Sequence, residues 1–333
     1  MSEGVQSPAP PAPAIQVSPS PHIGNTGLTT RRMMLDVVIA LVPAISIACF
    51  LFQWHAIAVL GLSVLSCLAA EALFTKMRGK ALHLDDGSAL VTGLILGLSL
   101  PWSAPPHVVA IAAFAAIGLG KMAFGGLGMN LFNPAMVGRA FVTLSFAQHM
   151  GGSAYVAGEA EWSALTQATP LTAARLEGVQ TDWSELFLGL VNGSLGEVSA
   201  LALILGGLYL CIRRAAAWEV PVGVLLGAAV AAFIAYLAGA HPFDPAGQLL
   251  SGSLLFGAFF IATDPCSSPV TRRGRWIFGI GIGLLAIFLR SFSSYPEGVM
   301  FAVLLMNAAV PLLNRWTIPS PLGGRTPTQP AKP

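Results

Sequence analysis

"GLILGLSLPWSAP", residues 93–105, and "GAFFIATDPCSSP", residues 257–269, share one pattern, and this repeat predicts the architecture of the chain. In both, a glycine is followed after seven residues by a proline, and then by Ser and Pro at alternate positions. Each copy closes an apolar stretch, and the second copy comes five such stretches after the first. Because five is odd, the two copies cross a membrane in opposite directions. The pair therefore predicts an inverted repeat, with Pro101 near the outer face and Pro265 near the inner face.

The whole chain has the composition of a membrane protein. Of its 333 residues, 55% are hydrophobic and only 10% are charged, whereas roughly a quarter are charged in soluble domains. We predict an all-α polytopic membrane protein in which ten transmembrane helices form a five-plus-five inverted repeat with broken helices. The apolar stretches cover residues 34–53, 56–75, 88–100, 108–124, 131–146, 198–212, 220–237, 249–262, 276–289 and 298–313.

The basic residues give the predicted orientation. With the N-terminus in the cytoplasm, the ten spans place five groups of Lys and Arg on the cytoplasmic side, in keeping with the positive-inside rule. We expect a disordered cytoplasmic tail, a first repeat, an external loop, a second repeat and a cytoplasmic tail. These parts cover residues 1–30, 31–148, 149–195, 196–314 and 315–333. The small net charge of +2 argues against nucleic acid as a partner.

A second pair of helix breaks is expected at "GGLGMNLFNPAM", residues 125–136, and at "SSYPEGVM", residues 293–300. In both, a proline can occupy the first turn of the following helix, which leaves N–H groups available to an anion or a phosphate. Asn133, directly before that proline in the first break, is therefore a candidate cofactor-binding residue. The alternative is that Gly and Pro at these places only allow close packing of helices.

Four charged residues lie in or beside the apolar stretches. A lysine such as Lys121 at the bilayer centre costs about 2.5 to 3.5 kcal/mol, so it either snorkels to the surface or pairs. Glu197 opens the sixth stretch, where it either caps the helix or binds an ion. Asp86 precedes the third stretch, and Asp264 ends the eighth among hydroxyl groups that suit a cation or the edge of a flavin. All four are candidates for an ion path. The four cysteines are far apart and predict no metal or iron–sulfur site.

Five ordered blocks resemble a known family, the NqrB/RnfD family. They are similar to the D subunit of the bacterial Rnf ion-translocating electron-transport complex. The related B subunit of the sodium-pumping NADH:quinone reductase shares the pattern, but the short N-terminus favours the Rnf protein. The resemblance covers residues 21–319. The blocks are "DGSALVTGLILGLSLP", "GGLGMNLFNPAMVGRAF", "GSLGEVSALALILGGLYL", "FGAFFIATDPCSSPVTRRGR" and "YPEGVMFAVLLMNAAVPLLN".

The resemblance implies a covalent flavin in the external loop. The family carries FMN on a threonine, joined through the flavin phosphate, and Thr169 would be the attachment residue here. The rest of the motif would be Thr166, Gln167 and Ala168, with Pro170 following. At two positions this sequence departs from the family. Gln167 stands where the family often has Gly, and Ser163 stands where the family frequently has Asp. Since a residue before proline favours extended backbone, we expect the hydroxyl of Thr169 to be exposed to a separate flavin transferase.

The resemblance also implies a function. The chain would be a subunit of an ion-translocating ferredoxin:NAD oxidoreductase without a complete active site or catalytic residues of its own. It would relay electrons through FMN, hold a second, non-covalent flavin such as riboflavin, and contribute to sodium or proton transport. Its partners would be membrane lipid and the other Rnf subunits, including the iron–sulfur subunits and the flavin-carrying G subunit. It would lie in the bacterial inner membrane, with both termini cytoplasmic and the flavin loop periplasmic. The alternative from another class is a channel or transporter with inverted repeats and no redox role.

Overall fold

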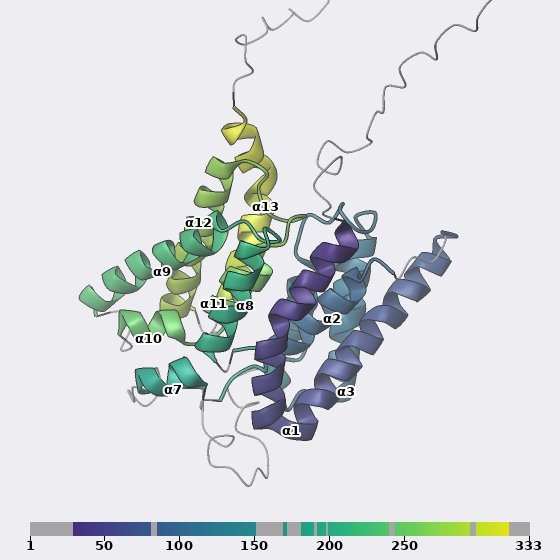
Figure 1. Ribbon diagram of the computed structural model, residues 1–333, viewed down its shortest axis with the longest axis horizontal. Helices are drawn as coiled ribbons and strands as arrows, with labels where there is room; N and C mark the ends of the chain where they lie inside the picture. The colour runs from purple at the N-terminus through teal and green to yellow at the C-terminus, as the bar shows by residue number, and fades with distance from the viewer. Residues whose placement is uncertain are drawn as a thin grey trace, which may run out of the picture.

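The computed structural model describes a helical protein (Figure 1). The residues that it describes are 29–80, 85–150, 169–171, 181–189, 192–197, 199–239, 244–293 and 298–319. Within these ranges the regular elements are helices, and β pairing is confined to one isolated bridge between Pro101 and Ser194. The structure thus confirms the all-α class.

The first half of the chain opens with a helical hairpin. Its two arms together form α1, Thr30–Met77, but Gln53 has a φ of 47° and breaks the helix there. The break falls between the first two predicted apolar stretches, so each arm corresponds to one stretch. The elements that follow are α2 Ser88–Ser99, α3 Pro106–Ala115, the π-helix η1 Ala116–Met122, α4 Pro134–Ser145 and α5 Ala147–Met150.

The second half contains a larger number of short elements. After α9 the chain forms two short α-helices and a π-helix in succession, in place of one continuous helix over residues 249–262. The elements are α7 Trp183–Leu188, α8 Ala200–Ile212, α9 Glu219–Leu237, α10 Pro245–Leu250, α11 Leu254–Phe256, the π-helix η4 Gly257–Ile261, α12 Arg272–Phe292 and α13 Val299–Thr317.

The two copies of the repeated pattern differ locally. Residues 93–105 include the end of α2, which is an unbroken α-helix up to Ser99. Residues 257–269, in contrast, begin with the π-helix η4. The second copy therefore begins in a π-helix, whereas in the first copy an α-helix ends at Ser99, before Pro101.

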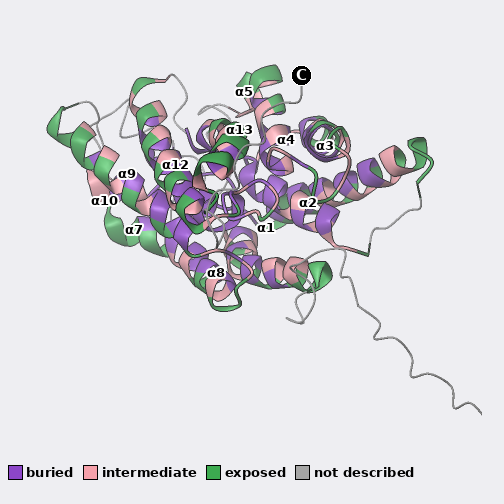
Figure 2. Ribbon diagram, turned by 90° about the horizontal axis from the view of Figure 1, so that it is seen from above, coloured by how far each residue is buried: buried purple, intermediate pink, exposed green. Residues whose placement is uncertain are grey.

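The surface of the helices suits a lipid environment. Four helices, α1, α9, α12 and α13, are long and apolar enough to cross a membrane. Large apolar side chains such as Leu35, Phe233 and Phe288 are more than half exposed on them, which is costly in water but not in lipid. The buried faces point inward, as the colours of Figure 2 show. These features indicate a multi-pass membrane protein.

The two halves of the chain meet along two helix pairs. In Figure 1, α1, α2 and α3 lie on the right, whereas α9, α12 and α13 lie on the left. At the first pair, α1 with α8, the Tyr209 hydroxyl and Arg213 Nε both donate to Asp36 Oδ1, at 3.1 and 3.2 Å. At the second pair, α4 with α13, the backbone N–H of Asn133 donates to Asn307 Oδ1 at 3.2 Å. The start of α1 and the end of α13 lie at the same end of the molecule, opposite α7 and the break in α1.

Candidate functional site

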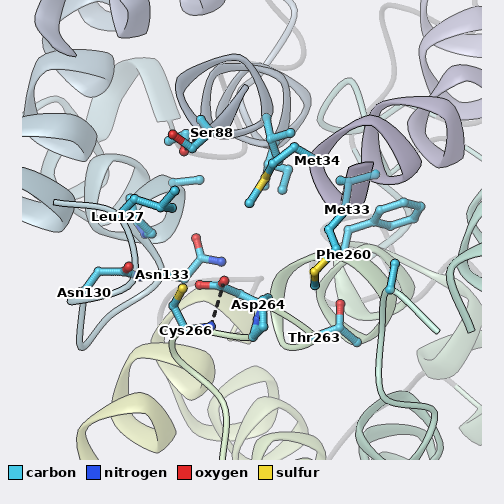
Figure 3. Close-up of a pocket in the computed structure, with 18 of the residues that line it drawn as sticks. Met33, Met34, Ser88, Leu127, Asn130, Asn133, Phe260, Thr263, Asp264 and Cys266 are labelled. Atoms are coloured by element: carbon cyan, nitrogen blue, oxygen red, sulfur yellow. Dashed lines mark hydrogen bonds between the residues drawn. The ribbon is translucent and has the colours of Figure 1, made fainter. Parts of the chain in front are cut away.

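The larger cavity lies between the two halves (Figure 3). It encloses about 820 Å³ that no protein atom fills, part of it open to solvent. Because it is lined by Met33 and Met34, it lies near the end of the molecule where α1 begins. The first half contributes Ser88, Lys121, Asn130 and Asn133, among others, and the second half contributes Phe260, Thr263, Asp264 and Cys266. The structure thus brings together Asn133, Asp264 and Lys121, three of the residues singled out in the sequence.

Asn133 ties the halves together at this cavity. It caps α4 by accepting a hydrogen bond from the N–H of Met136 at 3.3 Å. Its Nδ2 donates to the carbonyl of Ile261 at 3.2 Å. Ile261 ends η4, where a helix leaves carbonyl groups without intrahelical partners. Asn307, which accepts from the N–H of Asn133, also donates to the carbonyl of Ser267 at 2.9 Å. The break before α4 therefore holds a network that spans both halves.

Asp264 begins the turn after η4. Its carboxylate accepts from the N–H of Cys266 at 3.2 Å and from the hydroxyl of Ser267 at 2.8 Å. These bonds are those of an Asx turn, so part of the role of Asp264 is structural. The side chain is half-buried and lines the cavity, as Figure 3 shows. It can therefore still contact a cation or a polar ligand there.

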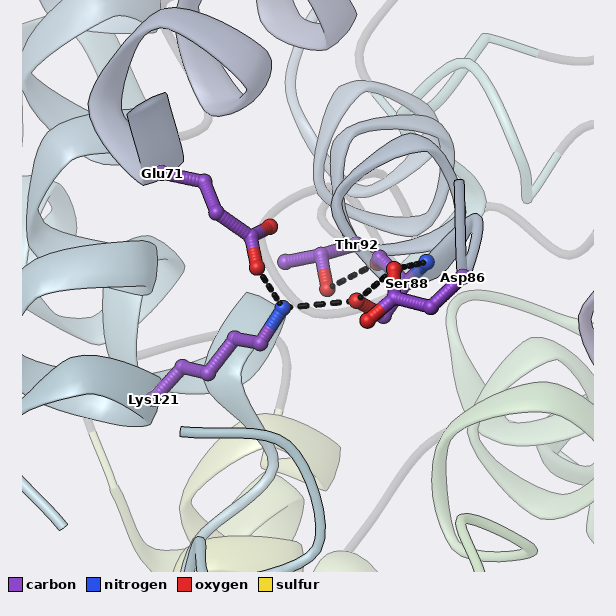
Figure 4. A network of polar contacts seen from close by, with 5 residues as sticks. All are labelled: Glu71, Asp86, Ser88, Thr92 and Lys121. Carbon is purple, nitrogen blue, oxygen red and sulfur yellow. Dashed lines mark hydrogen bonds and ion pairs between the residues drawn. The ribbon is translucent and has the colours of Figure 1, made fainter. Parts of the chain in front are cut away.

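Lys121 lies in a buried network within the first half (Figure 4). Its Nζ contacts Glu71 Oε1 at 2.5 Å and the hydroxyl of Ser88 at 2.6 Å. That hydroxyl donates to Asp86 Oδ1 at 2.7 Å. Since Lys121 is only 2% exposed, it pairs rather than snorkels. The network connects two of the candidate ion-path residues, Asp86 and Lys121, through Ser88.

Sequence reasoning missed Glu71. This carboxylate lies in "LAAEALF", inside the second apolar stretch, and is 5% exposed. An acidic residue within a membrane-spanning stretch requires a partner, just as a lysine does. Because Glu71 and Lys121 lie in two different apolar stretches and have opposite charges, the sequence could have predicted a buried ion pair between them.

The smaller cavity contains Thr169 and lies toward the opposite end of the molecule, beside α7. About 310 Å³ of its space is filled by no protein atom, part of it open to solvent, and it is lined by Thr169, Pro170, Leu171, Leu186, Asn192, Gly193, Glu197, Leu250, Ser251 and Gly252. Thr169 is only 8% exposed, which corrects the expectation of an exposed hydroxyl. The reason is that Thr169 lies in a cavity wall together with Leu171 and Leu186, which pack against each other. The other motif residues, Thr166, Gln167 and Ala168, fall outside the described residues.

Glu197 belongs to this smaller cavity and not to the Lys121 network. Its carboxylate forms a buried ion pair with Arg139 of α4, with 3.4 Å between Oε1 and Nη1. It lies before α8, but the cap of that helix is Ser199. Neither Glu197 nor Asp264 belongs to a cluster of metal-ligating side chains, since the described ranges contain no group of three His, Cys, Asp or Glu residues able to hold a metal ion.

Helix α4 connects the two cavities. Asn133 at its N-terminus lines the larger cavity, and Arg139 pairs with Glu197 in the wall of the smaller one. Arg139 comes six positions after Asn133, which corresponds to roughly 9 Å along a helix. The polar groups of the two cavities are thus linked through one short helix.

Comparison with known proteins gives a consistent result. Residues 16–323 match the NQR2, RnfD, RnfE family. The D subunit of the Na(+)-translocating ferredoxin:NAD(+) oxidoreductase complex from Acetobacterium woodii is 40% identical, over 91% of this chain and 93% of the relative. The D subunit of the proton-translocating complex from Clostridium ljungdahlii is 37% identical, over 93% and 96%. The D subunit of an ion-translocating oxidoreductase complex from Actinobacillus succinogenes is also 37% identical, over 92% and 98%. The chain therefore belongs to the NQR2, RnfD, RnfE family.

Proposed function

We propose that this chain is the D subunit of an ion-translocating ferredoxin:NAD oxidoreductase and relays electrons through FMN attached to Thr169. The observation that carries the proposal is the similarity to subunits of that name over more than nine-tenths of both chains. The same similarity favours this complex over the sodium-pumping NADH:quinone reductase. The other Rnf subunits would be its partners, and a flavin transferase would attach the FMN.

The residues around Thr169 fit a phosphate-linked flavin. The hydroxyl of Ser251 is buried in the cavity wall and has no hydrogen-bond partner among the described residues. It could therefore donate to a phosphate oxygen. Leu171 and Leu250 provide apolar surface for a flat ring, and the negative charge of Glu197 is offset by Arg139. When bound, FMN would supply the ability to take up and release electrons, whereas these residues would bind it, orient it and exclude water.

The larger cavity is the proposed site of the second, non-covalent flavin, such as riboflavin. Amide groups of Asn130 and Asn133 and the carboxylate of Asp264 line it beside the apolar side chains of Met34 and Phe260. A pocket with apolar walls and a few polar groups is typical of cofactor sites. Among the described residues that line this cavity, Lys121 is the one basic side chain. Such a lining suits a flavin without a phosphate.

The ion path is proposed to use the buried charges beside the two cavities. Asp86, Lys121 and Asp264 would lie on it at the larger cavity, with Glu71 as the partner of Lys121. Glu197 would belong to it at the smaller cavity. A change in the charge of a flavin in either cavity would alter the energy of these pairs, because electrostatic interactions are strong in a low-dielectric interior.

The proposed ten-helix inverted repeat receives support from the helix pairs at the interface. The first and sixth predicted spans meet there as α1 and α8, and the fifth and tenth meet as α4 and α13. Such pairing of equivalent elements is what a two-fold axis between repeats would produce. We further propose that the protein lies in the inner membrane, with cytoplasmic termini and a periplasmic Thr169.

An SDS gel viewed by flavin fluorescence tests the redox assignment. The chain produced together with its flavin transferase should fluoresce after denaturation, and the Thr169→Val variant should not. Thr172→Val, which removes a hydroxyl three residues further along the chain, is the matched control and should keep the fluorescence. A channel or transporter without a redox role would give no fluorescent band in any of the three, and this result would refute the proposal.

A further inference from the structure

We propose that Ser251 is a phosphate-binding residue of the Thr169 cavity, with its hydroxyl donating a hydrogen bond to the phosphoester that joins FMN to Thr169. This inference rests on the proposed attachment of FMN. It assigns a role to a residue of the second half of the chain, more than eighty positions after the threonine.

The hydroxyl of Ser251 is buried and available to a ligand. Ser251 is 2% exposed, and its Oγ has no hydrogen-bond partner within the described ranges. Leaving a buried hydroxyl unsatisfied costs roughly 1 to 3 kcal/mol, so such a group is normally paired. Because Ser251 lines the cavity together with Thr169, a ligand on that threonine would be within the same enclosed space.

The backbone at Ser251 is held in place. Helix α10 ends there, and Gly252 adopts a left-handed φ of 66° that turns the chain toward α11. Arg290 of α12, which is 1% exposed, donates from Nη1 to the carbonyl of Gln248 at 2.6 Å and from Nη2 to the carbonyl of Ser251 at 3.1 Å. The two bonds from one rigid guanidinium group fix the turn that carries the serine.

The charge of the proposed ligand also suits a neutral donor. FMN joined to a threonine through its phosphate is a phosphodiester with one negative charge. Glu197 also lines the cavity, but its ion pair with Arg139 offsets its charge. A neutral hydroxyl donor can stabilise the phosphodiester without a further buried cation, and hydrogen bonds to charged groups are stronger than neutral ones.

Digestion of the covalent flavin tests this role. The full chain, flavinylated and purified in detergent, would be incubated with a phosphodiesterase, and the covalent flavin that remains would be followed by fluorescence on SDS gels. Because Thr169 is buried, cleavage requires the site to open. We expect Ser251→Ala to lose its flavin about tenfold faster than the wild type, the factor expected from one hydrogen bond to a charged group. Ser251→Thr, which keeps the hydroxyl, should resemble the wild type.

Ser194→Ala is the matched control. Ser194 is fully buried and its hydroxyl also lacks a partner among the described residues, but it does not line the cavity. Its flavin should be released at the wild-type rate, and all variants should unfold at the wild-type temperature. Equal rates for Ser251→Ala and the wild type, or equally fast release from both alanine variants, would overturn the assignment of Ser251. A wild-type band without fluorescence before digestion would instead refute the FMN attachment itself, so the two failures can be told apart.

Discussion

At the scale of single residues, the ion pair of Glu71 and Lys121 shows that a charged side chain within a membrane-spanning stretch requires a partner of opposite charge. Both side chains are almost completely buried, and a hydroxyl from Ser88 provides a further contact for the ammonium group. Two charges removed from water are expensive, and their attraction only partly compensates. We therefore expect such a pair to serve a function. Lys121 lines the larger cavity, which is consistent with the proposed ion path.

Glu71→Gln should destabilise the protein strongly. It leaves a buried lysine without its counter-charge, and breaking a buried pair from one side costs roughly 3 to 5 kcal/mol. The double variant Glu71→Leu with Lys121→Met should recover most of the loss, since it removes both charges. The temperature of unfolding in detergent is the measurement.

The control for this prediction is Glu219→Gln. Glu219 pairs with Arg272 at 2.9 Å, but the Arg272 side chain is 74% exposed. Loss of such a pair should cost less than about 1 kcal/mol. If Glu71→Gln and Glu219→Gln unfolded at the same temperature, this result would contradict the burial of the Glu71–Lys121 pair.

At the scale of elements, α9 and α12 pack so closely that only glycine fits between them. Gly223 and Gly227 of α9 face Gly279 and Gly283 of α12, and on each helix the second glycine comes four positions after the first. A Cβ atom on Gly283 would lie 2.2 Å from the carbonyl oxygen of Val224. This small-residue spacing on both helices is a common basis of helix association in membranes.

Gly283→Ala should therefore weaken the protein although the added group is only one methyl. Overpacking of a tight interface typically costs about 1 to 3 kcal/mol. Gly61→Ala in α1 is the control, because a Cβ there would meet nothing within 4 Å, and replacing an unconstrained helical glycine usually stabilises. Unfolding temperatures should fall for the first variant and stay constant or rise for the second. A fall of the same size in both would contradict the proposed contact.

The elements also show how far the sequence allowed prediction. Apolar runs located α8 and α9 to within a few residues, since burial in lipid requires continuous apolar helix. The π-helix η4 was not predictable, because its residues are equally compatible with an α-helix. Its hydrogen bond with Asn133 joins residues 128 positions apart, which no local pattern reveals. The same holds for Thr169. Its proposed flavin attachment rests on resemblance, whereas its burial involves Leu186 and the turn at Ser251, which are distant in the sequence.

At the scale of the whole molecule, the two cavities lie toward opposite ends. The larger cavity is near the start of α1, whereas the smaller one is beside α7. With cytoplasmic termini, the proposed second flavin would lie toward the cytoplasm and the flavin on Thr169 toward the periplasm. Electrons passing between them would move from one end of the protein toward the other, and α4 is the short helix that lines the larger cavity and pairs with Glu197 of the smaller one.

This arrangement predicts the sidedness of the loops. His55, just after the break in α1, and Lys80, after the end of α1, are both exposed and are separated by the second arm of the hairpin. In intact cells stripped of the outer membrane, His55→Cys should react with a membrane-impermeant maleimide, whereas Lys80→Cys should react only after permeabilisation. The unsubstituted chain, with its own four cysteines, sets the background.

Labelling of Lys80→Cys in intact cells would place the start of α1 outside, and the larger cavity would then face the periplasm. In that case the proposed second flavin would lie toward the periplasm, so its proposed cytoplasmic placement depends on this result.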